Sequence, residues 1–181
     1  MAFGNAQDKK PSVRAQEALD SDPEEFAHQV VLNQLTTQAR SRSDLAQALA
    51  KKHVPAEVAT AVLDRFEEVG LIDDADFAQS WVTSRQRSKG LAPRALAQEL
   101  RRKGIDDDVA REALGTIDVD DEREAARLLV RKKLRAMQSL DLPTKMRRLT
   151  GMLARKGYSG QMAFDIVRSE LEQEAPPLES M

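Results

Sequence analysis

The chain has 181 residues, of which 32% are charged, 4% are aromatic and none is Cys. The missing Cys excludes disulfide scaffolds, zinc sites with Cys ligands and Cys nucleophiles. No apolar run approaches the roughly 18 residues that a membrane span needs, and no secretory signal peptide is visible, so we expect a cytoplasmic protein. The few aromatic and β-branched residues, beside many Ala, Leu, Glu and Arg, favour an all-α fold.

Three segments of the chain repeat one pattern, a basic pair followed by a small or polar residue and an apolar one. They are Lys51-Lys52-His53-Val54, Arg102-Lys103-Gly104-Ile105 and Arg155-Lys156-Gly157-Tyr158, at spacings of 51 and 53 residues. Two Leu residues spaced four apart precede each segment, as Leu45 and Leu49 do in the first. A period near 50 residues indicates repeats that share their burial by stacking. We therefore predict a tandem array of three three-helix repeats, elongated and curved.

The predicted organisation follows from this period and from the composition between the repeats. We expect a disordered N-terminal arm over 1–22, repeats over 23–72, 73–117 and 118–172, and a flexible tail over 173–181. In the first repeat, Ser43 or Asp44 is expected to open the second helix and Pro55 the third.

The second repeat gives the clearest helix signals. Asp74 or Asp76 is predicted to cap a helix that runs to about Ser88. Pro93 suits the first turn of the next helix, Gly104 should stop it, and Asp106 should cap the third.

The third repeat is expected to have a longer first helix, from about Asp120 to Met137. Pro143 should open its second helix and Ser159 its last.

Residues that could carry catalysis are scarce. His28 and His53 are the only His residues, and neither has a companion at metal-ligand spacing. The acidic run Asp73–Asp76 precedes a helix, where capping explains it. Trp81 could stack on a base or anchor a partner, but its apolar helical neighbours favour packing in the core. We therefore predict no enzyme, no metal and no cofactor.

Charge is segregated along the chain although the net charge is only −2. Residues 80–104 contain seven basic and one acidic residue, and residues 127–156 contain ten and one. The intervening residues 105–126 contain nine acidic and two basic residues. A single basic block can be a solvated helix face, whereas two such blocks indicate an acidic or anionic partner.

The candidate binding residues are basic side chains of these two blocks. Several lie four or seven residues apart and so share a helix face, and Arg suits bidentate contact with carboxylate or phosphate. The predicted partner-binding or DNA-binding residues are Arg85, Arg87, Lys89, Arg94, Arg101, Arg102, Lys103, Arg131, Lys132, Arg135, Arg147, Arg148, Arg155 and Lys156.

The segment from Gly70 to Val82, GLIDDADFAQSWV, resembles the core signature of the RecX family of recombination regulators. The continuation through Arg85, Glu99-Leu100 and Lys103-Gly104-Ile105 is similar to that family too, as is the segment from Leu153 to Tyr158. The resemblance covers about residues 25–172. It implies tandem three-helix repeats. It also implies binding along the groove of the RecA–single-stranded DNA filament, which restrains strand exchange, ATP hydrolysis and co-protease activity.

The partners that the resemblance implies are the RecA filament and single-stranded DNA. We also expect weak binding to duplex DNA and a monomeric protein. The first repeat departs from the family pattern because His53 stands where the other repeats have Gly. Two alternatives follow from the residues. One is a helix-turn-helix-like protein that binds double-stranded DNA, although its reader helices would be poor in basic residues. The other is a structural adaptor that binds acidic peptides.

Overall fold

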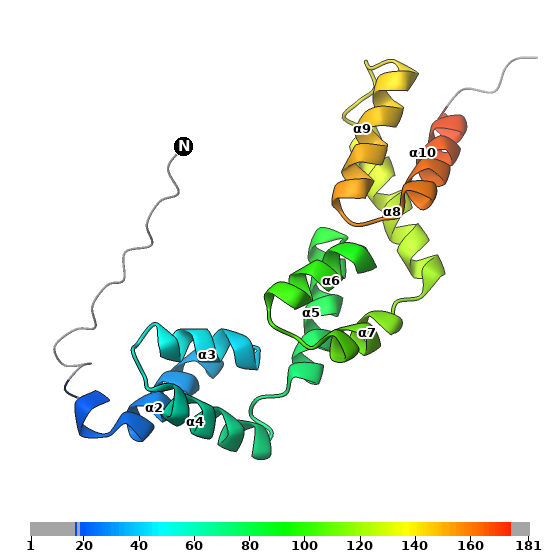
Figure 1. Cartoon of the computed structure of the whole chain (residues 1–181). Coiled ribbons are helices and arrows are strands. Elements are labelled where there is room, and N and C mark those ends of the chain that lie inside the picture. Colours follow the sequence, from blue (N-terminus) through cyan, green and yellow to red (C-terminus); the bar gives the residue numbers. More distant parts are fainter. Residues whose placement is uncertain (1–16, 18, 175–181) are drawn as a thin grey trace, which may run out of the picture. The chain divides into compact units, whose positions relative to one another are not determined.

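The computed structural model describes residue 17 and residues 19–174, and the regular elements in this part of the chain are α-helices (Figure 1). Contacts divide the chain into two compact units. The first unit reaches to Phe77 and includes the short segment Lys103–Ile105. The second unit contains Ala78–Arg102 and the chain from Asp106 onward. The all-α prediction is confirmed.

The first unit is built on three helices, α2 (Pro23–Leu35), α3 (Arg42–Ala50) and α4 (Ala56–Glu68), each of which packs against the other two. Their apolar faces bury Val31, Leu45, Leu49 and Phe66, among others, in one core. Asp22 caps α2 by accepting hydrogen bonds from the backbone N–H groups of the first turn.

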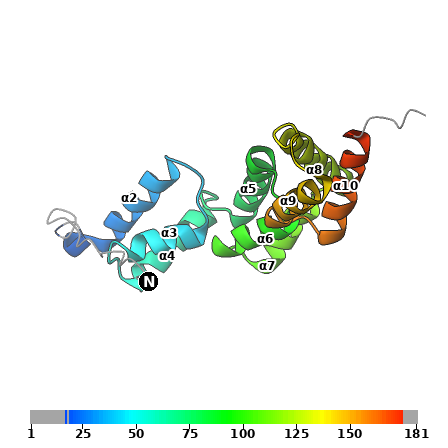
Figure 2. The same ribbon diagram turned by 90° about the horizontal axis from the view of Figure 1, so that it is seen from above.

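The second unit contains two sets of three helices. The first set is α5 (Asp74–Lys89), whose first turn belongs to the first unit, with α6 (Pro93–Arg102) and α7 (Asp107–Gly115). The second set is α8 (Val119–Leu134), α9 (Leu142–Arg155) and α10 (Gly160–Glu174), which pack on one another (Figure 2). Val130, Leu149, Leu153 and Val167 are fully buried in the core of this second set.

The turn at Lys103-Gly104, which belongs to the first unit, packs against the start of α3. Ser41 Oγ donates a hydrogen bond of 2.7 Å to the carbonyl of Lys103. Lys103 Nζ lies 2.8 Å from Asp44 Oδ2. Gly104 has φ +70, and a Cβ there would lie 2.4 Å from Ser43 Cβ. The turn therefore needs glycine both for its backbone angle and for its close contact.

The second unit repeats this arrangement one period later. The backbone N–H of Ala92 donates a 2.8 Å hydrogen bond to the carbonyl of Lys156. Tyr158 Oη donates to the carbonyl of Gly90 at 3.3 Å, and burial raises the pKa of this phenol to about 12. Gly157 has φ +92, and a Cβ there would lie 2.4 Å from Ala95 N. In both units, then, the turn after a repeat's second helix packs on the start of the preceding repeat's second helix.

Several predicted helix ends agree with the structure, and others are wrong by one to three residues. Pro93 opens α6, Asp106 caps α7 and Gly104 follows the end of α6, as predicted. The cap of α5 is instead Asp73, which accepts hydrogen bonds from the N–H groups of Ala75 and Asp76.

Asp74 does not cap α5 as predicted, but accepts a hydrogen bond from the start of another helix. Its carboxylate accepts a hydrogen bond of 2.8 Å from the backbone N–H of Arg42, at the start of α3. The α3 helix in turn is capped by Ser41, which precedes the predicted Ser43 and Asp44. Adjacent Asp and Ser residues offer equivalent side-chain acceptors, so tertiary packing decides which one caps.

The third repeat shows the same kind of difference. Its first helix is capped by Asp118 and ends at Leu134, three residues before the predicted end. Pro143 and Ser159 open α9 and α10 as predicted. Leu19, inside the predicted arm, is buried in the first core. Residues 1–16 and 18 of the predicted arm and residues 175–181 of the tail lie outside the described residues, so the domain boundaries remain a prediction.

Candidate partner-binding surface

In the second repeat, one carboxylate neutralises part of the predicted basic face. Glu99 accepts a hydrogen bond of 2.9 Å from Trp81 Nε1. It also lies 3.1 Å from Arg85 Nε and 3.7 Å from Lys89 Nζ. The guanidinium of Arg85 sits 4.1 Å above the centre of the Trp81 ring. The prediction that Trp81 packs in the core is wrong, because its ring is half-buried and supports Arg85.

Other predicted binding residues also make contacts with residues of the fold. Arg131 forms a forked pair with Glu170, with distances of 2.7 and 3.0 Å, and these hydrogen bonds raise the pKa of Arg131. Glu170 is only 5% exposed, so this pair fixes α8 against α10. Lys156 donates to the carbonyl of Lys89 in the turn described above. Arg101 makes an exposed pair with Asp107 at 3.3 Å, which contributes little to stability.

The third repeat carries a hollow of about 560 Å³ between the end of α8 and the outer face of α9. Four cations and two methionines line it, and no carboxylate is among the lining residues: they are Lys133, Met137, Arg147, Arg148, Met152 and Arg155. We call this surface the basic hollow. Close packing of like charges around a concavity raises the local positive potential and attracts anions.

The basic hollow has a neutralised counterpart in the second repeat. Val82 of α5 aligns with Val130 of α8, and Leu100 of α6 aligns with Leu153 of α9, each fully buried. On this alignment Lys133 stands at the position of Arg85 and Met152 at that of Glu99. The third repeat therefore lacks the carboxylate that pairs with the cations of the second repeat. Lys133 is absent from the sequence prediction, and this alignment is the signal that identifies it.

The remaining predicted residues are not among those that line the basic hollow. Arg87 lines an open depression on α5 together with hydroxyl and amide side chains. Arg94 lies near the half-buried carboxyl of Glu122. Partial burial raises the pKa of Glu122, and the charge of Arg94 partly opposes that rise. The side chains of Arg102, Lys132 and Arg135 are exposed.

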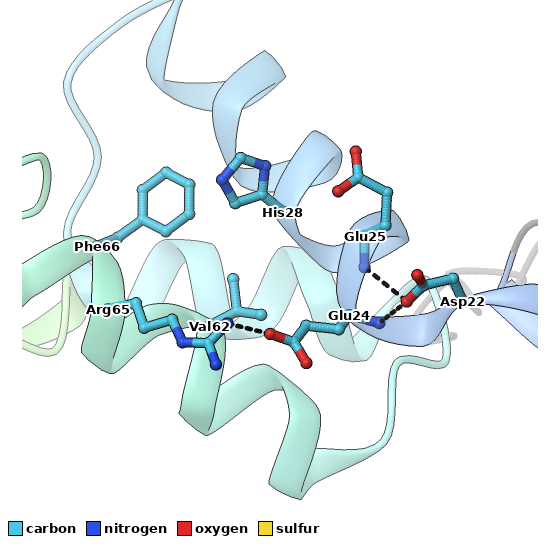
Figure 3. A pocket seen from close by; sticks show the side chains of 7 residues that line it. All are labelled: Asp22, Glu24, Glu25, His28, Val62, Arg65 and Phe66. Carbon is cyan, nitrogen blue, oxygen red and sulfur yellow. Dashed lines mark hydrogen bonds and ion pairs between the residues drawn. The ribbon is translucent and has the colours of Figure 1, made fainter.

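The first unit offers an acidic cavity instead of a basic surface (Figure 3). It measures about 250 Å³, and Glu24 makes an ion pair with Arg65 across it. The imidazole of His28 packs against Phe66, with 5.0 Å between the ring centres. In the part of the chain that the structure describes, no group of three or more His, Cys, Asp or Glu residues could hold a metal ion. None of the helices described is long and apolar enough to span a membrane.

The chain consists of three-helix repeats whose Lys-Gly turns pack on the preceding repeat, and the third repeat has a basic hollow with no carboxylate among its lining residues. These features define a helical-repeat binding protein. Three family models match the chain: the first three-helix domain of RecX over residues 27–66, the second over 73–114 and the third over 120–167. The chain belongs to the RecX family of regulatory proteins, which are not enzymes and which inhibit the RecA recombinase.

Relatives and solved structures agree with this assignment. The regulatory protein RecX of Streptomyces coelicolor is 51% identical over 160 residues, covering 88% of this chain and 85% of its own. That of Thermobifida fusca is 48% identical over 148 residues, covering 82% and 80%. The crystal structure of RecX from Lactobacillus salivarius matches with a TM-score of 0.72 at 22% identity, over 84% of this chain and 97% of that one. At this identity the structural match supports the fold.

Proposed function

We propose that this protein binds the RecA–single-stranded DNA filament in the bacterial cytoplasm through the basic surfaces of its second and third repeats. Binding there restrains strand exchange, ATP hydrolysis and co-protease activity. The observation that carries the proposal is the basic hollow, where four cations meet without a carboxylate among the lining residues. A protein–DNA filament presents many carboxylates and phosphates at regular intervals, which suits a chain with several basic surfaces.

The internal contacts narrow the set of predicted binding residues. Arg85, Lys89, Lys103, Arg131 and Lys156 hold elements of the fold together, so their substitution would disturb packing as well as binding. We assign the filament contacts to the cations that project from the second and third repeats: Arg87, Arg94, Arg101, Arg102, Lys132, Lys133, Arg135, Arg147, Arg148 and Arg155.

A titration into RecA–single-stranded DNA filaments, following ATP hydrolysis, tests the proposal. We expect the wild-type chain to inhibit hydrolysis and to lose affinity as salt rises, because screening weakens contacts between charges. A variant with Arg87→Glu, Arg102→Glu, Arg148→Glu and Arg155→Glu should inhibit at least tenfold more weakly, a loss of about 1.4 kcal/mol or more. Circular dichroism should show unchanged helix content.

The matched control reverses four exposed cations outside these surfaces, at Lys51, Lys52, Arg111 and Arg168. It changes the net charge equally and should retain most of the inhibition. Equal inhibition by the wild type and by the first variant would contradict the assignment of the surface.

The same titration separates the filament regulator from a double-stranded DNA reader. A reader helix would need basic or amide side chains toward the groove, but α7 carries Asp107, Asp108 and Glu112 beside the single cation Arg111. We therefore expect weak binding to bare duplex DNA. Tight duplex binding without an effect on ATP hydrolysis would favour the reader.

A further inference from the structure

We infer that the basic hollow receives an acidic protein segment that inserts an apolar side chain, so that this repeat contacts the recombinase polypeptide and not its DNA. The inference rests on the proposed function and names the partner of the same surface. It follows from the position that the hollow occupies within the repeat.

One lining residue, Arg148, stands at the position where the earlier repeats receive the turn of a neighbouring repeat. Asp44 in α3 receives Lys103 of the next repeat at 2.8 Å. One period later, Ala95 in α6 lies against Gly157 of the next repeat. Asp44 lies five residues before the buried Leu49, and Ala95 lies five residues before the buried Leu100. Arg148 lies five residues before the buried Leu153, so it occupies the corresponding position in α9. The described part of the chain has no further repeat to cover it.

The charge at this docking position is reversed between the first and the third repeat. Asp44 attracts a basic turn, whereas Arg148 lines the basic hollow together with Lys133, Arg147 and Arg155. A further turn of the Lys-Gly type would meet like charge there, and a turn bearing Asp or Glu would meet opposite charge. Opposed charges across an interface favour encounter and exclude wrong partners.

The apolar part of the lining favours a protein segment over nucleic acid. Met137 is buried and Met152 is partly buried, and the flexible thioether of Met152 can adapt to an inserted aliphatic or aromatic side chain. Single-stranded nucleic acid is commonly held by aromatic side chains on which bases stack, and none of the lining residues is aromatic. At the position of Arg148, the first two repeats contact polypeptide turns through Asp44 and Ala95.

Met152→Glu tests the inference because it restores the carboxylate that Glu99 supplies in the second repeat. The new carboxylate should pair with the cations of the basic hollow and compete with an acidic ligand. We expect about tenfold weaker binding to RecA–single-stranded DNA filaments, equivalent to roughly 1.4 kcal/mol, and unchanged binding to bare single-stranded DNA. Gln161→Glu on the exposed start of α10 is the control, with the same change in charge.

Because Met152 is partly buried, Arg148→Glu provides a second variant at an exposed side chain, with the same expected loss. Equal losses on filaments and on bare DNA would show that the hollow binds phosphates and would overturn the inference. Wild-type affinity in both variants would also overturn it, while leaving the proposed function intact. A wild-type chain that fails to bind filaments would overturn the proposed function, and the inference with it.

Discussion

At the scale of single residues, glycine serves two purposes in the turns through which one repeat packs on the preceding one. Gly104 and Gly157 both have positive φ, which ends a helix in the left-handed conformation. Both also lie so close to the preceding repeat that a Cβ would collide with it. His53 has φ +61 at the same position of the first repeat, so this turn is left-handed there too, with a residue other than glycine.

We expect Gly157→Ala to destabilise the fold by about 2–5 kcal/mol. A left-handed backbone costs a residue with a Cβ about 1–2 kcal/mol, and overpacking adds about 1–3 kcal/mol. The nearest atom is the backbone nitrogen of Ala95, which cannot move aside as a flexible side chain would. Urea unfolding measures the loss. Gly160→Ala is the control, because nothing lies within 4 Å of its added Cβ. Similar stabilities of the two variants would contradict the packing argument.

The contacts of the basic residues show what could not be predicted at this scale. The Lys-Gly motif predicts a helix end. The contacts of this turn with Ser41 and Asp44, about 60 residues away, could not be predicted from the motif. The carboxylates that neutralise Arg85 and Arg131 lie 14 and 39 residues further along the chain. Charge counts along a sequence cannot reveal such pairs, because tertiary packing sets them.

At the scale of elements, α9 combines a buried face with a basic one. Leu149 and Leu153 are fully buried, while Arg148 and Arg155 are exposed on the opposite side. This division follows the 3.6-residue period, and it is why the helices themselves could be predicted. Their ends could be predicted less well: where Asp and Ser residues adjoin, local preference does not choose between the possible caps.

Gly151 lies in the interior of α9 without a steric requirement for glycine. A Cβ at this position would meet only Arg155 Nη1, at 3.4 Å. We therefore expect Gly151→Ala to stabilise the protein by about 0.5–1 kcal/mol, because alanine has the higher helix propensity. Ala154→Gly, at an exposed position in the same helix, should have a similar effect of opposite sign. The midpoints of urea unfolding measure both. A loss of stability in Gly151→Ala would show that the glycine has a packing role.

At the scale of the whole molecule, the repeats are alike in their cores and different in their charge. The core positions repeat from the first to the third, which is why the tandem three-helix organisation could be predicted from periodicity alone. The docking position changes from Asp44 through Ala95 to Arg148, and the Lys-Gly turn becomes Lys52-His53 in the first repeat. These differences decide which surfaces can join. These charge differences do not follow the repeat period, so their effect on packing could be identified only from the contacts in the structure.

The same differences oppose self-association, in which the first repeat of one copy would dock on the third repeat of another. Lys51 and Lys52 would face Arg148, and the imidazole of His53 would occupy the place where Gly104 leaves no room for a Cβ. Both the charge and the steric barrier oppose an open chain of molecules, which a head-to-tail contact would otherwise permit. We therefore expect the protein to be a monomer, at low as well as at high salt.

Sedimentation velocity over a range of protein concentrations tests whether the protein is a monomer. The wild type should keep one sedimentation coefficient throughout. A double variant, His53→Gly with Arg148→Asp, removes the steric barrier and gives the third repeat the carboxylate that Asp44 supplies in the first. Its sedimentation coefficient should rise with concentration, most at low salt, where attraction between Lys52 and the new Asp is least screened. Either single variant retains one barrier and should remain monomeric. A concentration-dependent coefficient in the wild type would show that these two residues do not limit assembly.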